Sequence, residues 1–306
     1  VATLTINRPE AMNALNETVV AQLNDALDLV NADDSVHTIV LDGAGKAFVA
    51  GADVKFFVDK IRADAIPDIV TFTADGHVML NKLENSNKTT IALTTGLALG
   101  GGLELALACD YRIGTRRTQF RFPETSIGIY PGLGGTQRPA RISGIPSARW
   151  AVLAGNFMDA QTAHDLGLLT HLVNVSAVDS CVSELSSVGK PENKYPGAPS
   201  NPSSATASFA TSFYSNENMS TLLSGACPEG FDAEEKNIAR QLRSLSRTAP
   251  IALKMASDLI NATSQSDLSE GLQMELDQLT KIFTTSDSLE GLSALIEGRK
   301  PTYSNS

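Results

Sequence analysis

Residues 99–110 read LGGGLELALACD, and this stretch decides the fold class. An apolar residue leads into three glycines, and a run rich in Leu and Ala follows, which is the pattern of a strand that turns directly into a helix. Strand patterns flank the stretch at 90–94 and 111–113. Strands that alternate with helices at this spacing predict an α/β domain of stacked βαβ-type units.

The N-terminal part of the chain repeats the same alternation. Residues 1–6 alternate like a strand, and Asn16 is placed to cap a helix whose apolar residues keep helical spacing over 19–30. A short buried strand is predicted at 38–41 and a helix at 66–83. The unit of strand, turn and helix therefore recurs along this part of the chain.

The composition changes between Ser186 and Gly230. Just over half of these residues are Ser, Pro, Gly or Asn, and apolar periodicity is weak, which indicates a linker, a long insertion or a disordered loop. Helical spacing of apolar residues returns after residue 236. The sequence therefore predicts three parts: an α/β core over 1–175, a Ser/Pro-rich insertion or linker over 176–235 and a helical region over 236–306.

Charge, apolar patterning and cysteine usage exclude several classes of protein. The 306 residues carry a net charge of −10 with no acidic or basic block, which argues against a nucleic-acid partner. The longest apolar stretch, 91–109, contains the glycine triplet and Glu104, so no membrane span is predicted. Cys109, Cys181 and Cys227 have no CxxC spacing, and the N-terminus has no secretory pattern. We therefore expect a reducing, cytoplasmic environment and no metal site.

The glycine triplet favours contact between a ligand and the backbone. Glycine has no side chain to block the approach, and the first N–H groups of the following helix lack intrahelical partners and carry the positive end of its dipole. Such amides suit an anion or a developing oxyanion. The alternative is that these glycines only permit close packing of strand and helix. The triplet does not match GxGxxG, and residues 43–46 lack the spacing of a P-loop.

Two glutamates lie in apolar sequence. Glu104 follows Gly101 by three residues amid Leu and Ala, and Glu124 stands between FRFP and another mostly apolar segment. A carboxylate in such surroundings is neutral, paired or used in catalysis. Two of them suit general acid and base work, because burial and mutual repulsion separate their pKa values. Motifs of serine hydrolases and zinc enzymes are absent, and we expect the four histidines to be structural or surface residues.

Five segments together resemble the crotonase (enoyl-CoA hydratase/isomerase) superfamily, and the chain is most similar to its enoyl-CoA hydratases. The segments occur in the family's order: NRPEAMNAL at 7–15, FVAGADVK at 48–55, ALGGGLE at 98–104, FPE at 122–124 and PGLGGTQR at 131–138. The similarity covers 1–175 and resumes near 247–303.

The resemblance implies a fold, an assembly and a site. The fold would be a spiral of ββα units with a C-terminal helical trimerisation region. The protein would be a homotrimer or a dimer of trimers that binds acyl-CoA thioesters, with CoA as part of the substrate and no separate cofactor. The family pattern implies that Glu104 and Glu124 are catalytic, and that the N–H groups of Ala50 and Gly101 form an oxyanion hole for the thioester oxygen. Contacts with the substrate or its CoA would involve Ala50, Gly51, Ala52, Asp53, Gly101 and Gly132.

The implied reaction is the reversible syn addition of water to a trans-2-enoyl-CoA such as crotonyl-CoA, which gives a 3-hydroxyacyl-CoA, as in β-oxidation. Glu124 would pass a proton at C2, and Glu104 would orient the water and help to deprotonate it. A Δ3,Δ2-enoyl-CoA isomerase that uses Glu124 alone is an alternative. A non-catalytic RNA-binding or scaffolding relative is another, although the acidic net charge argues against it.

Three features depart from the family pattern. The family's first strand precedes Val1, so the resemblance allows this chain to be the hydratase part of a fusion with a 3-hydroxyacyl-CoA dehydrogenase domain. The serine-rich segment is longer than the usual connection. Glu10 stands where several relatives carry a Lys near the CoA phosphates, so one favourable charge is missing.

Overall fold

The computed structural model describes residues 1–306, which form nine strands, fourteen α-helices and three short 3-10 helices. The strands are β1 (Ala2–Ile6), β2 (Thr38–Gly43), β3 (Ala47–Ala50), β4 (Thr89–Leu93), β5 (Leu97–Leu99), β6 (Tyr111–Gly114), β7 (Gln119–Arg121), β8 (Met158–Asp159) and β9 (His171–Leu172). The α-helices are α1 (Glu17–Ala32), α2 (Val54–Arg62), α3 (Ile66–Glu84), α4 (Gly101–Ala108), α5 (Arg138–Ser143), α6 (Ile145–Val152), α7 (Ala160–Asp165), α8 (Val178–Val188), α9 (Ala205–Phe213), α10 (Asn216–Leu223), α11 (Lys236–Leu245), α12 (Pro250–Ala262), α13 (Leu268–Phe283) and α14 (Ser286–Glu297). The 3-10 helices are η1 (Pro9–Ala11), η2 (Glu124–Ile127) and η3 (Val175–Ala177). None of the helices combines the length and the apolarity that crossing a bilayer requires.

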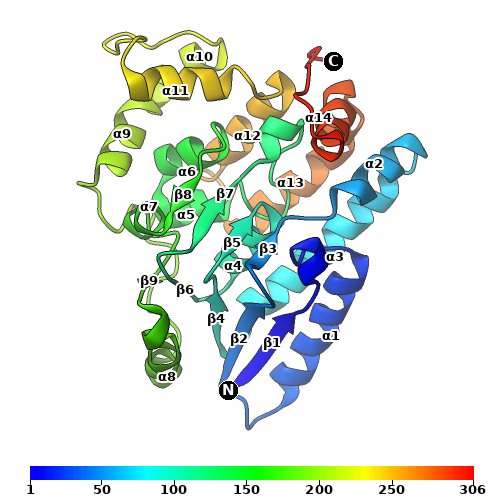
Figure 1. Ribbon diagram of the computed structural model, residues 1–306, viewed down its shortest axis with the longest axis vertical. Coiled ribbons are helices and arrows are strands. Elements are labelled where there is room, and N and C mark those ends of the chain that lie inside the picture. The colour runs from blue at the N-terminus through cyan, green and yellow to red at the C-terminus, as the bar shows by residue number, and fades with distance from the viewer.

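The strands form two sheets, and successive strands of the core divide between them. The larger sheet has the order β1-β2-β4-β6-β9 with all pairs parallel, and the smaller has the order β3-β5-β7-β8 with only β7 and β8 antiparallel. Three pairs of consecutive strands have one member in each sheet: β2 with β3, β4 with β5, and β6 with β7. The chain therefore advances as a spiral (Figure 1). Helices follow the first two of these pairs, so the predicted spiral of ββα units is confirmed.

The strands of the smaller sheet are too short for their period to be recognised in the sequence. β3, β5 and β7 have four, three and three residues. Their register aligns Ala50 with Leu99 and Leu99 with Arg121. All three strands end at these aligned residues, so the turns that follow the strands meet at one edge of the sheet.

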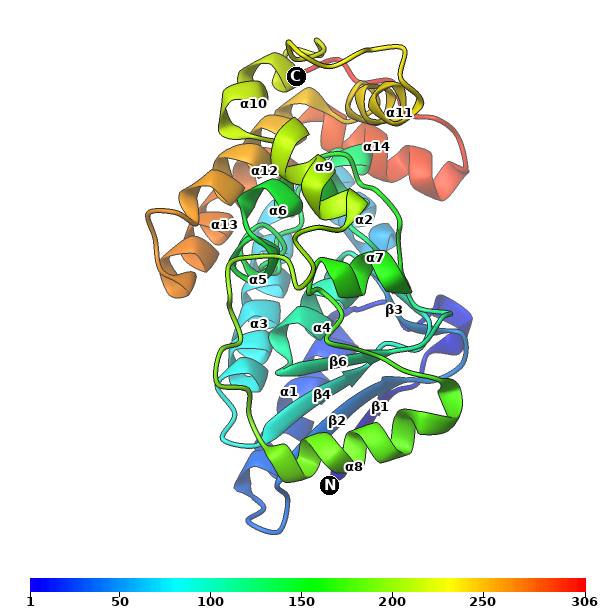
Figure 2. The same ribbon diagram turned by 90° about the vertical axis from the view of Figure 1, so that its left-hand side faces the viewer.

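The central strands of the larger sheet are buried on both faces. In β2, Ile39 and Leu41 belong to the main apolar core, whereas Val40 lies in a separate cluster with Cys181 and Leu185 of α8. Figure 2 shows α8 running across this outer face. Burial on both faces explains why residues 39–41 are uniformly apolar rather than alternating.

The C-terminal helices pack on helices from the first third of the chain. α13 contacts α3, and α14 contacts α2. Leu279 and Ile282 of α13 are buried, and Phe283 stacks on Phe57 of α2 with ring centroids 5.3 Å apart. The helical character predicted after residue 236 is confirmed, and it brings α13 and α14 beside the edge at which the turns of the smaller sheet meet.

The serine-rich stretch contains helices of its own. α8, α9 and α10 fall within 176–235, and Phe213 and Tyr214 at the end of α9 are fully buried. Arg149 of α6 donates hydrogen bonds to the carbonyl of Tyr214 and to the side chain of Asn216, which ties this stretch to the spiral. The division of the chain at residues 175 and 235 stays a prediction.

Candidate active site

A cavity of about 250 Å³, the active-site cavity below, lies where the turns of the smaller sheet meet the C-terminal helices. Its walls are mostly apolar and include Phe57 of α2 and Leu279 of α13. Only three charged residues line it, Glu104, Arg121 and Glu124. The predicted site residues that line it are Ala50, Gly51, Ala52, Gly101, Glu104, Glu124 and Gly132.

The glycine triplet serves both the cavity and the packing of the helix. Gly100 has a φ of +47°, and a Cβ on it would overlap Oε1 of Glu124, so only glycine leaves room for that carboxylate. A Cβ on Gly102 would overlap the carbonyl oxygen of Val49, so Gly102 permits the close approach of α4 to β3. Gly101 begins α4 and lines the cavity. The two interpretations of the triplet therefore apply to different glycines.

Two backbone amides beside the cavity make no hydrogen bond within the protein. Gly101 is the first residue of α4, so its N–H has no intrahelical acceptor. The N–H of Ala52 is also unbonded, and its nitrogen lies 3.8 Å from the place that a Cβ on Gly101 would take. The N–H of Ala50, in contrast, donates to the carbonyl of Met12 at 3.0 Å. The prediction that Ala50 supplies a free amide is therefore wrong, because the N-terminal loop already occupies that amide.

Glu104 projects from the first turn of α4 and is buried. Its Oε1 accepts hydrogen bonds from the N–H groups of Leu133 and Gly135, both at 2.7 Å. Burial raises the pKa of Glu104 to about 7, although these two hydrogen bonds and the charge of Arg138 oppose the shift. Oε2 accepts no hydrogen bond from the protein, so it is available to a ligand in the cavity.

Glu124 begins η2, which follows β7 after Phe122 and Pro123, and it is also buried. Its Oε2 has no hydrogen-bond partner. Burial, and after it the charge of Glu104, raise the pKa of Glu124 well above its ordinary value. Because each charge disfavours the other and both groups are buried, the pair favours a state in which it keeps one proton. One cavity thus offers a proton donor and a proton acceptor.

A third buried carboxylate, which the sequence analysis missed, binds the loop next to Glu104. Glu275 of α13 accepts hydrogen bonds from the N–H groups of Gly134 at 2.6 Å and Thr136 at 3.0 Å. Glu104 and Glu275 therefore bind alternate amides of one loop. The sequence holds a signal for this residue, because Glu275 stands four residues before Leu279 on the apolar face of its helix.

Two further buried residues hold this loop. Nε2 of His77 lies 2.6 Å from the carbonyl oxygen of Gly132, and burial lowers the pKa of His77 to about 4, so the neutral ring donates this hydrogen bond. Arg138 donates to the carbonyl of Leu133 at 2.9 Å and pairs with Glu84 at 2.8 Å. His77 contacts the loop but does not line the cavity, which fits the structural role expected for the histidines.

Asp53 is the predicted site residue that does not line the cavity. Its carboxylate lies 3.9 Å from the guanidinium of Arg8, and 37% of its side chain is exposed. It precedes α2 without forming a capping hydrogen bond. The structure contains no group of three or more His, Cys, Asp or Glu side chains that could hold a metal ion.

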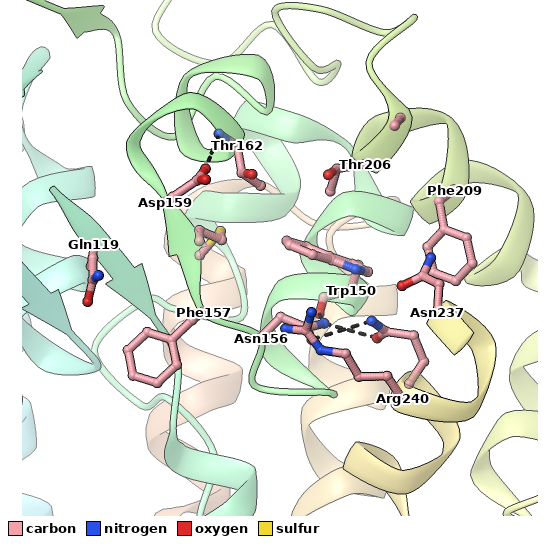
Figure 3. Close-up of a pocket in the computed structure, with 13 residues that line it drawn as sticks. Gln119, Trp150, Asn156, Phe157, Asp159, Thr162, Thr206, Phe209, Asn237 and Arg240 are labelled. Carbon is pink, nitrogen blue, oxygen red and sulfur yellow. Dashed lines mark hydrogen bonds between the residues drawn. The ribbon is translucent and has the colours of Figure 1, made fainter. Parts of the chain in front are cut away.

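A second cavity, of about 380 Å³, lies between the spiral and the helices α9 and α11 (Figure 3). The amide side chain of Asn156 in its wall is hydrogen-bonded to Gln241. The only carboxylate that lines it, Asp159, accepts the N–H of Thr162 and so caps α7. This cavity has no second acid and no glycine turn. The first cavity combines two buried acids with a glycine turn, so it is the candidate active site.

Comparisons with known proteins agree with this geometry. The family model described as enoyl-CoA hydratase/isomerase matches residues 1–306. A protein of Mycobacterium bovis named "Probable enoyl-CoA hydratase" is 32% identical over 305 residues, which cover 100% of this chain and 95% of that protein. The crotonyl-CoA hydratase of Syntrophomonas wolfei is 30% identical over 303 residues, or 99% of this chain and 94% of that one. The crystal structure of an enoyl-CoA hydratase from Rhodobacter sphaeroides shares the fold, with a TM-score of 0.83 at 24% identity over 99% of this chain and 89% of that chain. On the match of its whole length, the chain belongs to the enoyl-CoA hydratase/isomerase family.

Proposed function

We propose that this chain is an enoyl-CoA hydratase, which adds water reversibly to trans-2-enoyl-CoA thioesters such as crotonyl-CoA. One observation carries the proposal: two buried carboxylates, Glu104 and Glu124, and two unbonded amides line the same cavity. Full-length relatives that are named as hydratases support it. An isomerase moves one proton and needs one carboxylate, so the presence of the second acid favours hydration.

The N–H groups of Ala52 and Gly101 are the proposed oxyanion hole. As water adds to C3, negative charge moves from the C2=C3 bond to the thioester oxygen. Amides aimed at that oxygen stabilise the enolate-like state, and each donor of this kind typically contributes about 3 to 4 kcal/mol. Ala52 replaces Ala50 in this role, because only the amide of Ala52 is unbonded.

The two carboxylates divide the proton transfers. The loop amides fix Oε1 of Glu104, so Oε2 is free to bind a water molecule and to accept its proton as the water oxygen bonds to C3. Glu124, whose pKa is raised well above its ordinary value, is the proposed donor of the pair's proton to C2. Glu104 gains one proton and Glu124 loses one, so a return of that proton through solvent restores the starting state.

Hydration of crotonyl-CoA, followed by the loss of enoyl-thioester absorbance, tests the proposal. We expect turnover by the wild-type chain and its loss in Glu124→Gln. A chain that leaves crotonyl-CoA unchanged but converts a 3-enoyl-CoA to the 2-enoyl isomer would contradict the hydratase and support the isomerase. Glu104→Gln separates the two reactions, because isomerisation through Glu124 alone does not need Glu104.

The proposal includes a trimer or a dimer of trimers built on the C-terminal helices. Met274 of α13 is 40% exposed, and Leu295 and Ile296 of α14 are 52% and 51% exposed. Large exposed apolar side chains on adjacent helices favour an interface between subunits. Light scattering tests this assembly, and a monomer would contradict it.

We also propose a cytoplasmic role in β-oxidation, with no cofactor apart from the CoA of the substrate. The three cysteines are free, which suits a reducing compartment. Fractionation of the source cells tests the location.

A further inference from the structure

Arg121 is a charged residue that the proposed reaction does not use. It is the only cation that lines the active-site cavity, whose walls are mostly apolar. No carboxylate lies within ion-pair distance of its guanidinium. An arginine stays charged in proteins, and Arg121 is only partly buried, so its guanidinium is reached from the cavity and from solvent. The carboxylate whose charge acts on Arg121 is that of Glu124, which is the proposed proton donor and makes no ion pair with it. A carboxylate of the substrate could therefore form the ion pair that the protein does not provide.

The structure holds this guanidinium in place and leaves part of it free. Its Nε donates to the carbonyl of Gly155 at 2.9 Å, and its Cζ lies 4.7 Å from the centre of the Phe157 ring. Phe157, over which this guanidinium lies, belongs to the wall of the second cavity (Figure 3), whereas Arg121 itself lines the active-site cavity. Nη1 and Nη2 donate no hydrogen bond to the protein. These nitrogens belong to a planar fork that matches the two oxygens of a carboxylate.

The register of the smaller sheet places Arg121 relative to the thioester. Ala50 and Arg121 stand in one row, two strands apart, which corresponds to about 10 Å at the usual strand spacing. The proposed oxyanion amides follow β3 and β5, and Glu124 follows β7. In the proposed complex the thioester oxygen accepts from the amides of Ala52 and Gly101, and C2 lies beside Glu124. The acyl chain therefore extends from β3 towards β7, which carries Arg121.

We infer that Arg121 forms an anionic subsite, and that the substrate class is enoyl-CoA thioesters whose acyl chain ends in a carboxylate. The inference rests on the proposed function and adds the substrate to it. A terminal carboxylate supplies the missing counter-ion, whereas a neutral acyl chain leaves the guanidinium unpaired in the wall. The phosphates of CoA carry similar oxygens at the other end of the substrate, so the experiment must separate these two sources.

Titration calorimetry with two saturated thioesters tests the subsite without the chemical step. Adipyl-CoA and hexanoyl-CoA have the same chain length and differ by one terminal carboxylate, and neither can be hydrated. We expect the wild-type chain to bind adipyl-CoA at least about tenfold more tightly than hexanoyl-CoA. Arg121→Met should lose this preference, and Arg121→Lys, which keeps the charge without the fork, should retain part of it. The matching pantetheine thioesters, which have no phosphates, should show the same preference.

Kinetics supply a second readout. The ratio of kcat/KM for trans-2-hexenedioyl-CoA over trans-2-hexenoyl-CoA should fall at least about tenfold in Arg121→Met. An unchanged ratio with equal losses on both substrates would overturn the subsite and show that Arg121 acts on Glu124. A loss of affinity in Arg121→Met that is equal for both thioesters and absent with the pantetheine thioesters would overturn the subsite and show that Arg121 binds the CoA phosphates. A wild-type chain that binds both thioesters equally well would also overturn the subsite. If neither substrate is hydrated but the carboxylate preference in binding is present, the subsite stands and the hydratase proposal fails.

Discussion

Two buried carboxylates bind the same loop, and only one of them lines the active-site cavity. Glu104 and Glu275 accept hydrogen bonds from alternate amides of residues 133–136. Burial is the main cause that raises the pKa of Glu104 to about 7 and that of Glu275 to about 8. In burial and in the direction of the pKa shift, the two residues are alike.

The difference lies in the oxygens that remain available. Glu104 binds the loop through Oε1 alone, so Oε2 is left for the cavity. Both oxygens of Glu275 are occupied, because Oε2 accepts from Gly134 and Oε1 accepts from the N–H and the hydroxyl of Thr136. Burial and a raised pKa therefore do not identify a catalytic acid. What distinguishes Glu104 is a carboxylate oxygen that accepts no hydrogen bond from the protein in a residue that lines the active-site cavity.

Within the comparison of Glu104 and Glu275, the largest effect is expected for Glu104→Gln, which should lower kcat for crotonyl-CoA hydration at least about 100-fold. The amide oxygen of Gln can still accept the N–H groups of Leu133 and Gly135, so the loop keeps its position, but the group that accepts the proton of water is lost. Steady-state kinetics measure the effect, and circular dichroism shows whether the fold is intact. Turnover within tenfold of the wild type would remove Glu104 from the mechanism.

The next largest effect is expected for Gly100→Ala, because the new methyl group would overlap Oε1 of Glu124. Displacing this carboxylate should lower kcat at least about tenfold. Gly298→Ala is the matched control, since Gly298 also has a positive φ, +66°, but a Cβ there meets no atom within 4 Å. Gly298→Ala should lose about 1 kcal/mol of unfolding free energy, because Gly298 has left-handed helical angles (φ 66°, ψ 25°). Gly100→Ala should lose more, because its ψ of −122° lies outside that region. Equal kinetic losses in the two variants would show that strain, rather than contact with Glu124, lowers activity.

A smaller effect is expected from acid. Glu104 must be ionised to accept a proton, and its pKa is about 7. Lowering the pH from 7 to 6 should therefore reduce kcat/KM about fivefold, and raising the pH until Glu124 loses its proton should reduce kcat/KM again. A pH–rate profile with crotonyl-CoA below saturation measures both limbs. The charges of Glu104 and Glu275 disfavour each other, so the acid limb in Glu275→Gln should stay in place or move to lower pH. A shift of that limb to higher pH would contradict this interaction.

The sequence predicts those parts of the site that local pattern determines. Glu104, Glu124 and the glycine turn stand within short motifs, and the structure places all of them at one cavity. β3, β5 and β7 are too short to show a period, so the second sheet could not be derived from alternation. Local pattern also could not predict two long-range hydrogen bonds. The amide of Ala50 donates to a residue 38 positions earlier, and Glu275 binds a loop about 140 residues before it.

The smallest effect on catalysis is expected for Glu275→Gln, and the largest part of its effect should be on stability. The loop presents donors to both oxygens of Glu275, but Gln has only one acceptor oxygen, so its NH2 group must face an N–H of the loop. A buried donor without an acceptor costs about 1 to 3 kcal/mol, and the free energy of unfolding in denaturant should fall by that amount. Because Glu104 keeps its own two hydrogen bonds to the loop, kcat should fall less than about threefold. A large loss of kcat with an unchanged free energy of unfolding would show that Glu275 takes part in the reaction, and the distinction between occupied and unoccupied carboxylate oxygens would then fail.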